Sequence, residues 1–195
     1  MQKHTELVKK NLAESIEIKS KVKEKLASKI AQVAMILADC LKKDNKILLC
    51  GNGGSAADAQ HLAAELMVRL RANSRNFPLP AIALSTDTSI LTACANDFGF
   101  ENIFSRQIQA LGKRGDCLVA ISTSGKSENI ILAAKQAKKL GIKVIGFLGK
   151  DGSKLAKLVD YPLFVPSNNI PRIQEVHTTI GHIILELVEK EFISK

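Results

Sequence analysis

An apolar run that passes through a glycine-rich turn into a helix of small residues is the feature that most restricts how this chain can fold. It covers residues 48–65 and contains the turn Gly51-Asn52-Gly53-Gly54-Ser55. In this layout a buried strand delivers backbone N–H groups and a helix N-terminus to an anion. The glycines can take positive φ and let a ligand approach the backbone, while Asn52 and Ser55 add side-chain donors and Ser55 can cap the helix. The turn lacks the dinucleotide-binding and P-loop spacings, so it predicts a site for a phosphate or a polyol.

His61 and Glu65 lie one turn apart on this predicted helix, so their side chains point in the same direction. A different face carries the apolar stripe, which consists of Ala59, Leu62, Leu66 and Leu70. An imidazole beside a carboxylate suggests a metal pair or an acid/base pair. The alternative is an ordinary solvated pair, and the position directly behind the glycine turn favours the functional interpretation.

The composition narrows the class of protein. A chain of 195 residues with 46% hydrophobic content fits one domain with a substantial core. No apolar run approaches the roughly 20 residues of a membrane span and no apolar signal region opens the chain, so we expect a cytoplasmic protein without a membrane partner. The net charge of +9 is compatible with nucleic acid, but no Trp and one Tyr leave little for base stacking, so we expect a small anionic substrate and no nucleic acid.

The four cysteines show no C-x-x-C spacing and are expected to be reduced structural thiols.

Predicted strands alternate with predicted helices along the chain. The strands cover residues 46–50, 79–84, 117–121, 143–148 and 161–165. Helices are expected up to about residue 43, over 88–95 and 102–112, up to 140, and from 171 onward. This order indicates a parallel sheet that binds ligands at the carboxyl ends of its strands, with Pro162 placing the fifth strand at an edge. The apolar periodicity before residue 43 predicts two helices that serve oligomerisation or, alternatively, only cover the sheet.

Hydroxyl side chains gather where the third predicted strand ends. Neutral donors beside a helix N-terminus suit a phosphate that must bind and leave, whereas the alternative, a capped turn, needs only one hydroxyl. Asn96 and Asp97 follow a short helix and form either a substrate-facing corner or a turn. The hydroxyl group consists of Ser122, Thr123, Ser124 and Ser127 around Gly125.

The last predicted helix carries a histidine away from its core stripe. His182 shares a face with Gln174 and Thr178, and Gly181 leaves space for another group to approach. Without further context, His182 would be interpreted as a solvated histidine. The stripe consists of Ile173, Val176, Ile180, Ile184 and Leu187.

Taken together, these motifs resemble the sugar isomerase (SIS) domain family, and within it the phosphoheptose isomerases. The resemblance extends over essentially the whole chain and implies a flavodoxin-like three-layer α/β SIS domain with a five-stranded parallel sheet. It implies one domain over 1–195, with oligomerising helices in 1–43 and the α/β core in 46–195. It further implies a homotetramer with active sites at subunit interfaces. The matching motifs lie at 51–55, 58–61, 65, 96–100, 121–125, 149–152 and 172–177.

The resemblance also implies an activity and a set of site residues. Members convert sedoheptulose 7-phosphate to D-glycero-D-manno-heptose 7-phosphate, the first step of ADP-heptose biosynthesis for lipopolysaccharide core. Glu65 would be the catalytic base and His182 its acid partner. A divalent metal, most likely zinc, one per subunit, would be bound by His61, Glu65, Gln174 and His182. Substrate would be bound by Asn52, Gly53, Gly54, Glu65, Asn96, Asp97, Ser122, Thr123, Ser124, Ser127 and Gln174.

Geometry makes Gln174 the weakest expected ligand. It is separated from His182 by about 12 Å along an ideal helix, at 1.5 Å per residue. Glutamine is also an unusual zinc ligand.

Two other SIS-domain functions were weighed. A non-catalytic relative that binds the bacterial replication initiator resembles the isomerase but lacks the carboxylate and the histidine that correspond to Glu65 and His182. A phosphosugar-sensing regulator would be expected to carry an attached domain, for which this chain has no room. The presence of Glu65 and His182 therefore favours the enzyme.

Overall fold

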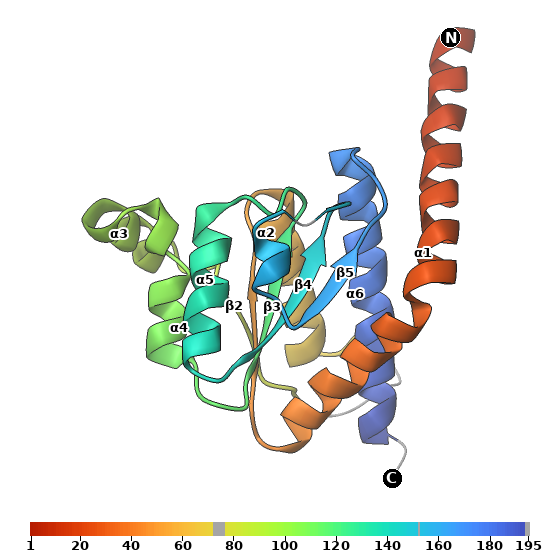
Figure 1. The fold of residues 1–195 in the computed structure, drawn as a ribbon. Helices are drawn as coiled ribbons and strands as arrows, with labels where there is room; N and C mark the ends of the chain where they lie inside the picture. Colours follow the sequence, from red (N-terminus) through yellow and green to blue (C-terminus); the bar gives the residue numbers. More distant parts are fainter. Residues whose placement is uncertain (72–76, 152, 194–195) are drawn as a thin grey trace.

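Five parallel strands form the centre of the molecule, in the order β2-β1-β3-β4-β5 (Figure 1). A computed structural model describes residues 1–71, 77–151 and 153–193. The central strands β1, β3 and β4 are buried on both faces, as expected for a parallel sheet between two helical layers. Pro162 lies in β5 at the sheet edge, as predicted. The strands are β1 (Ile47–Cys50), β2 (Ala81–Ala83), β3 (Cys117–Ser122), β4 (Lys143–Leu148) and β5 (Tyr161–Phe164).

Helices cover both faces of the sheet, which confirms the predicted three-layer fold. One core cluster joins α1, α2 and α6 to one face, and a second joins the region from α3 to α5 to the other (Figure 1). Alternating side chains of each strand enter the two clusters: Ile47 and Leu49 enter the first, Leu48 and Cys50 the second. The helices are α1 (Gln2–Lys42), α2 (Gly54–Met67), α3 (Thr88–Phe98), α4 (Ser105–Leu111), α5 (Glu128–Lys139) and α6 (Ile170–Ile193), with 3₁₀ turns at Phe100–Asn102 and Leu155–Lys157.

The expectation of two N-terminal helices is wrong, because α1 is one continuous helix of 41 residues. No glycine or proline interrupts residues 2–42, so nothing in the sequence ends the helix early. From Ile18 onward its apolar stripe is buried on the body. The apolar side chains before that point are 56% to 66% exposed, and Figure 1 shows this part of α1 extending beyond the other elements. These exposed side chains are Leu7, Val8, Leu12 and Ile16.

Two other helix boundaries differ from the predictions. Helix α3 begins behind Asp87, whose Oδ1 accepts the Ile90 N–H at 2.9 Å, and continues to Phe98. Asn96 and Asp97 therefore lie in its last turn and do not form a corner after it. The segment predicted as a helix over 102–112 begins with a 3₁₀ turn, and the α-helix starts only at Ser105.

Two further observations concern the cysteines and the length of the helices. All four cysteines are free and buried, as expected for structural thiols. Among the described helices, none combines the length and the apolar character that a bilayer span requires.

The change of direction in strand order places the predicted ligand loops together. Chain order runs outward from β1 to β2 on one side and from β3 to β5 on the other. Cys50, at the end of β1, is in register with Ala120 near the end of β3. The glycine turn and the hydroxyl-rich loop thus leave neighbouring strands at one edge, where open α/β sheets bind ligands.

Candidate active site

The glycine turn brings the start of α2 close to two other segments. Gly53 has φ +55° and is the N-cap of α2, so it needs the left-handed freedom of glycine. A Cβ at Gly54 would lie 2.5 Å from Gln174 Nε2, so the glycine lets the Gln174 side chain of α6 lie against the loop. Ser55 does not cap α2: it is buried inside the helix, and the helix start has no side-chain cap. N–H groups in this first turn have no intrahelical acceptor and can bind an anion.

The hydroxyl-rich loop after β3 is arranged to donate hydrogen bonds. Ser122 Oγ accepts the Gly125 N–H at 3.1 Å, and Ser124 Oγ accepts the Lys126 N–H at 3.2 Å. Each hydroxyl thus uses a lone pair inside the loop and retains its proton for a ligand. Ser127 is the N-cap residue of α5 but makes no side-chain cap, so the alternative of a simple capped turn is wrong.

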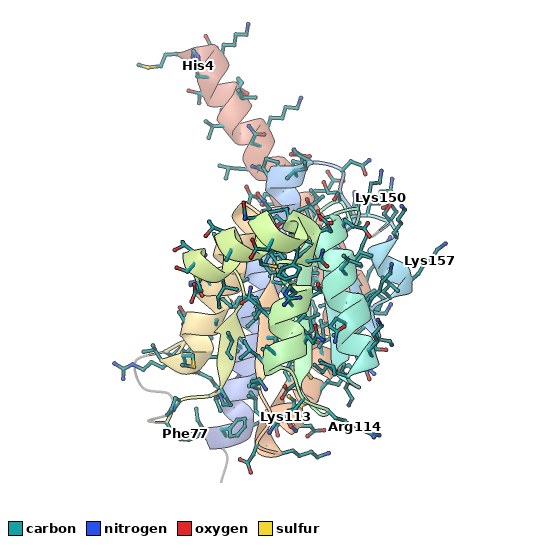
Figure 2. All side chains as sticks on the ribbon, turned by 90° about the vertical axis from the view of Figure 1, so that its left-hand side faces the viewer. His4, Phe77, Lys113, Arg114, Lys150 and Lys157 are labelled. Atoms are coloured by element: carbon teal, nitrogen blue, oxygen red, sulfur yellow. The ribbon has the colours of Figure 1, made fainter. Side chains whose placement is uncertain are left out.

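A cavity of about 250 Å³ opens beside this loop. Two lysines and one aspartate line it, so its charge suits an anionic group. Lys150 extends from the edge of the body, at the opposite end of the molecule from Lys113 and Arg114 (Figure 2). The lining residues include Thr123, Ser124, Lys126, Lys150, Asp151 and Asn168.

His61 of α2 and His182 of α6 face each other. Their Nε2 atoms are 2.6 Å apart, with ring centroids at 4.9 Å and ring planes at 75°. The interpretation of His182 as a solvated histidine is therefore wrong. Gly181 permits this approach, because a Cβ there would lie 2.6 Å from Leu62 Cδ2 of α2. The two helices can thus pack closely enough for their histidines to meet.

Glu65 lies on the other side of the His61 ring. Its Oε1 is 3.8 Å from His61 Nδ1, whereas His182 faces the opposite ring nitrogen. A carboxylate beside an imidazole can orient the ring. The arrangement places a carboxylate next to two imidazole rings in contact, and both kinds of side chain can transfer protons.

Asp58 is a site residue to which the sequence analysis gave no role. Its Oδ1 accepts the Thr178 hydroxyl at 2.7 Å, and its Oδ2 is buried without a hydrogen-bond partner among the described residues. Burial raises the pKa of the Asp58 carboxyl, while Thr178, His61 and His182 act to lower it. The available signal was position: Asp58 precedes His61 by three residues on α2 and so lies on the same helix face.

Part of the expected zinc donor set converges at this point. Two imidazole nitrogens from different helices converge, and imidazole is a preferred zinc ligand. Glu65 and Gln174 do not converge with them, since Glu65 is beside the far ring nitrogen and Gln174 lies against Gly54. In residues 1–71, 77–151 and 153–193 no group of three or more His, Cys, Asp or Glu side chains is placed to hold a metal ion.

Asn96 and Asp97 lie on a different helix from His182 and Gln174. Both are exposed, and Asn96 Nδ2 donates to Asp97 Oδ1 at 2.8 Å. Figure 1 shows α3 at the opposite side of the molecule from α6, which carries His182 and Gln174. The assignment of the predicted site residues to substrate and metal stays a prediction.

The fold and the ligand loops define a phosphosugar-binding α/β domain of the SIS type. The family model for the SIS domain matches residues 11–149, and the chain belongs to that family. It is 51% identical over 187 residues to the phosphoheptose isomerase of Nitratiruptor sp., covering 96% of this chain and 99% of the relative. It is 54% identical over 185 residues to that of Aquifex aeolicus, covering 95% and 96%.

A solved structure supports the same assignment. The phosphoheptose isomerase of Neisseria gonorrhoeae superposes with a TM-score of 0.90 at 44% identity, over 95% of this chain and 98% of that one. Within the SIS family, the chain therefore belongs to the phosphoheptose isomerases, which are aldose–ketose isomerases.

Proposed function

We propose that the protein interconverts sedoheptulose 7-phosphate and D-glycero-D-manno-heptose 7-phosphate, as the first step towards ADP-heptose for lipopolysaccharide core. The observation that carries this proposal is the His61–His182 contact with Glu65 beside it, about two helical turns along α2 from a glycine turn suited to polar ligands. Curated relatives with about half of their residues identical are named phosphoheptose isomerases. The replication-initiator alternative is not favoured, because both Glu65 and His182 are present.

The reaction requires two proton transfers on adjacent carbons. A base removes a proton from C1, a cis-enediol(ate) forms, and a proton returns at C2. Glu65 is the base that removes the proton from C1. His182 is the acid that donates a proton to an oxygen or a carbon of the enediolate. His61 lies between them and contacts both, so it orients Glu65 and shares a hydrogen bond with His182.

The phosphate end of the substrate belongs at the hydroxyl-rich loop. Ser122, Thr123, Ser124 and Ser127 supply neutral donors, and the N-terminus of α5 adds its dipole. Lys126 and Lys150 line the adjoining cavity and add positive charge. The sugar hydroxyls then extend towards Asn52, Gly53 and Gly54 in the neighbouring loop.

The metal is part of this proposal. His61 and His182 would hold a divalent cation, zinc by preference. Glu65 and Gln174 stay the predicted further ligands, although they do not converge with the two imidazoles in this structure. Such an ion would polarise a carbonyl and stabilise the negative charge that develops on its oxygen. Asp58 Oδ2, which is buried without a hydrogen-bond partner among the described residues, is an acceptor for a proton or a bound water.

The active protein is proposed to be a cytoplasmic homotetramer. The exposed apolar residues of α1 and the exposed rings of Phe98 and Phe100 near Asn96 and Asp97 offer surfaces for other subunits. A second chain would bring its α3 to the site that α2 and α6 form in the first chain. This arrangement explains why Asn96 and Asp97 lie far from His182 within one chain.

The test is ketose-to-aldose conversion of sedoheptulose 7-phosphate by the purified protein and by Glu65→Gln. Removing the general base is expected to lower kcat by about 10²- to 10⁴-fold without loss of folding. The control is Glu24→Gln, an exposed glutamate paired with Lys23 on α1, which should keep full turnover. Near-normal turnover of Glu65→Gln would contradict the assigned base.

Chelation separates the metal from the rest of the proposal. Loss of turnover on removal of divalent metal, with recovery on adding Zn²⁺, supports a metal role. Full turnover in the chelated protein removes the metal from the mechanism. Absence of turnover with every divalent metal tried would favour the initiator-binding alternative.

A further inference from the structure

A reciprocal amide pair connects the two ligand loops. Asn52 Nδ2 donates to Asn129 Oδ1 at 2.9 Å, and Asn129 Nδ2 donates to Asn52 Oδ1 at 2.9 Å. Asn52 belongs to the glycine turn after β1, and Asn129 belongs to the first turn of α5 after the hydroxyl-rich loop. Asn129 is only 3% exposed, so the pair is shielded from water on the α5 side.

Two simultaneous hydrogen bonds fix both the position and the rotation of the Asn52 amide. Each amide uses one N–H and one oxygen lone pair in the pair and keeps a second N–H. The free N–H of Asn52 therefore points in a direction set by Asn129. Breaking the pair would leave a buried amide unsatisfied, which costs more than the pair itself contributes.

The side chain of Asn52 connects the glycine turn to the loop before α5. In Gly51-Asn52-Gly53-Gly54, Asn52 is the only residue with a side chain. Within the turn, the Ser55 N–H bonds the Asn52 carbonyl at 3.0 Å, and the Ala56 and Ala57 N–H groups bond the Gly53 carbonyl. These backbone bonds join the turn to α2, whereas the amide pair sets its position relative to the hydroxyl-rich loop.

The other end of the pair is already rigid. The loop before α5 is closed by the backbone N–H groups of Gly125 and Lys126, which bond Ser122 and Ser124. Asn129 lies in the first turn of α5, where the Ile130 and Ile131 N–H groups bond the Ser127 carbonyl. The pair therefore connects the glycine turn to the hydroxyl-rich loop.

We propose that Asn129 is a positioning residue for the isomerase, which holds Asn52 and the glycine turn at a fixed distance from the phosphate loop. The inference rests on the proposed isomerase function. It predicts that Asn129 affects the reacting end of the substrate while contacting neither the substrate nor the metal. A misplacement of about 1 Å at a reacting centre can cost about 10²-fold in rate.

The test compares Asn129→Leu and Asn129→Asp with the wild-type protein, using kcat, KM and the inhibition constant of inorganic phosphate. Leucine removes both hydrogen bonds, and an ionised aspartate can accept from Asn52 Nδ2 but cannot donate to Asn52 Oδ1. Both variants are expected to lose about 10- to 100-fold in kcat. The inhibition constant of phosphate is expected to stay within about twofold, because the serine loop keeps its own hydrogen bonds.

Gln107→Leu is the matched control. Gln107 is also a buried amide, whose Nε2 donates to the carbonyls of Leu84 and Ile103 at 2.8 Å, but these bonds join α4 to the segment after β2 and reach neither the glycine turn nor the hydroxyl-rich loop. It should lower thermal stability and leave kcat per folded protein unchanged. An Asn129→Leu protein whose kcat per folded molecule stays within twofold of wild type would overturn the proposal.

Two further measurements keep the result independent of folding and of the substrate. In a double-mutant cycle, the losses of kcat in Asn52→Ala and Asn129→Ala should not be additive, because either substitution removes the pair. Additive losses would contradict the inference. Hydrogen exchange of residues 51–55 needs no substrate and should accelerate in Asn129→Leu but not in Gln107→Leu. If the wild-type protein shows no turnover, the proposed function fails, while unchanged exchange would reject the role of Asn129 separately.

Discussion

The contact between α2 and α6 and the end of α3 both carry predicted site residues, but the chain treats them differently. At the α2–α6 contact, close helix packing brings the Nε2 atoms of His61 and His182 to 2.6 Å, and Glu65 lies 3.8 Å from the other ring nitrogen of His61. At the end of α3, Asn96 and Asp97 stand exposed and bond each other. Under the proposed homotetramer, one half of the site would be completed by folding and the other half by association.

Subunit complementation is the test with the largest expected effect. Glu65→Gln and Asp97→Ala should each abolish most of the activity, by about 10²-fold or more. When the two chains are co-expressed with different tags and purified through both, the mixed oligomers should regain part of the activity. A site that takes Glu65 from one chain and Asp97 from another contains only wild-type residues in some of its copies.

The matched control for complementation uses two residues that meet within one chain. Glu65→Gln mixed with His182→Gln should show no recovery, because every site keeps one defect. Recovery in this control would mean that Glu65 and His182 of one site come from different chains. No recovery in the first mixture would mean that Glu65 and Asp97 of one site come from the same chain.

A methyl group added between α2 and α6 should disturb the contact of His61 with His182 and leave Asn96 and Asp97 unaffected. Gly181→Ala places a Cβ 2.6 Å from Leu62 Cδ2, so the helices must separate or the buried Leu62 must leave its position. Alanine favours a helix over glycine by about 1 kcal/mol, so a net loss of stability would report the clash. Overpacking of this kind costs about 1–3 kcal/mol, and we expect about a tenfold or greater fall in kcat as His61 and His182 part.

A compensating change distinguishes the clash from a general defect. Leu62→Ala creates room for the new methyl group, so Gly181→Ala with Leu62→Ala should be less unstable than the sum of the two single variants. Unfolding midpoints in urea and kcat of the three proteins give the comparison. Strict additivity would show that Gly181 is not needed for the approach of the helices.

The sequence was sufficient for features that depend on local pattern. The strands followed from apolar runs bounded by glycine and polar residues, and Pro162 identified an edge strand. His61 with Glu65 and the hydroxyl-rich loop were found because spacing on one element is visible in sequence. Local pattern also misplaced the end of α3, because nothing at Asn96 or Asp97 stops a helix.

Features that depend on contacts between distant segments could not be found in this way. The pairing of Asn52 with Asn129 joins residues 77 positions apart, and the bond from Thr178 to Asp58 spans 120. The continuity of α1 was missed, because two helices were expected although no glycine or proline interrupts residues 2–42. Sequence also gave no sign that Gln174 would rest on Gly54, which requires the relative placement of α6 and the glycine turn.

The smallest expected effect concerns His177, which holds α6 to the sheet and has no predicted role in catalysis. It is fully buried on α6, and its Nε2 lies 3.2 Å from the Leu148 carbonyl at the end of β4. Burial lowers the pKa of His177 from its usual value of 6.5 to about 4. The folded protein therefore keeps the ring neutral where the unfolded chain would protonate it.

The sign of the pH effect follows from this difference. The stabilising contribution is fully present above pH 6.5 and is lost as the pH falls towards 4, because the unfolded chain then binds the additional proton. Between pH 7 and pH 5 the wild-type protein should lose about 2 kcal/mol of unfolding free energy from this group. His177→Gln, which can still donate to Leu148 but does not titrate, should lose less over that interval. His4→Gln, at an exposed position on α1 (Figure 2), should follow the wild-type curve. If the unfolding free energies of wild type and His177→Gln fall in parallel between pH 7 and pH 5, burial of this ring does not govern the loss of stability in acid.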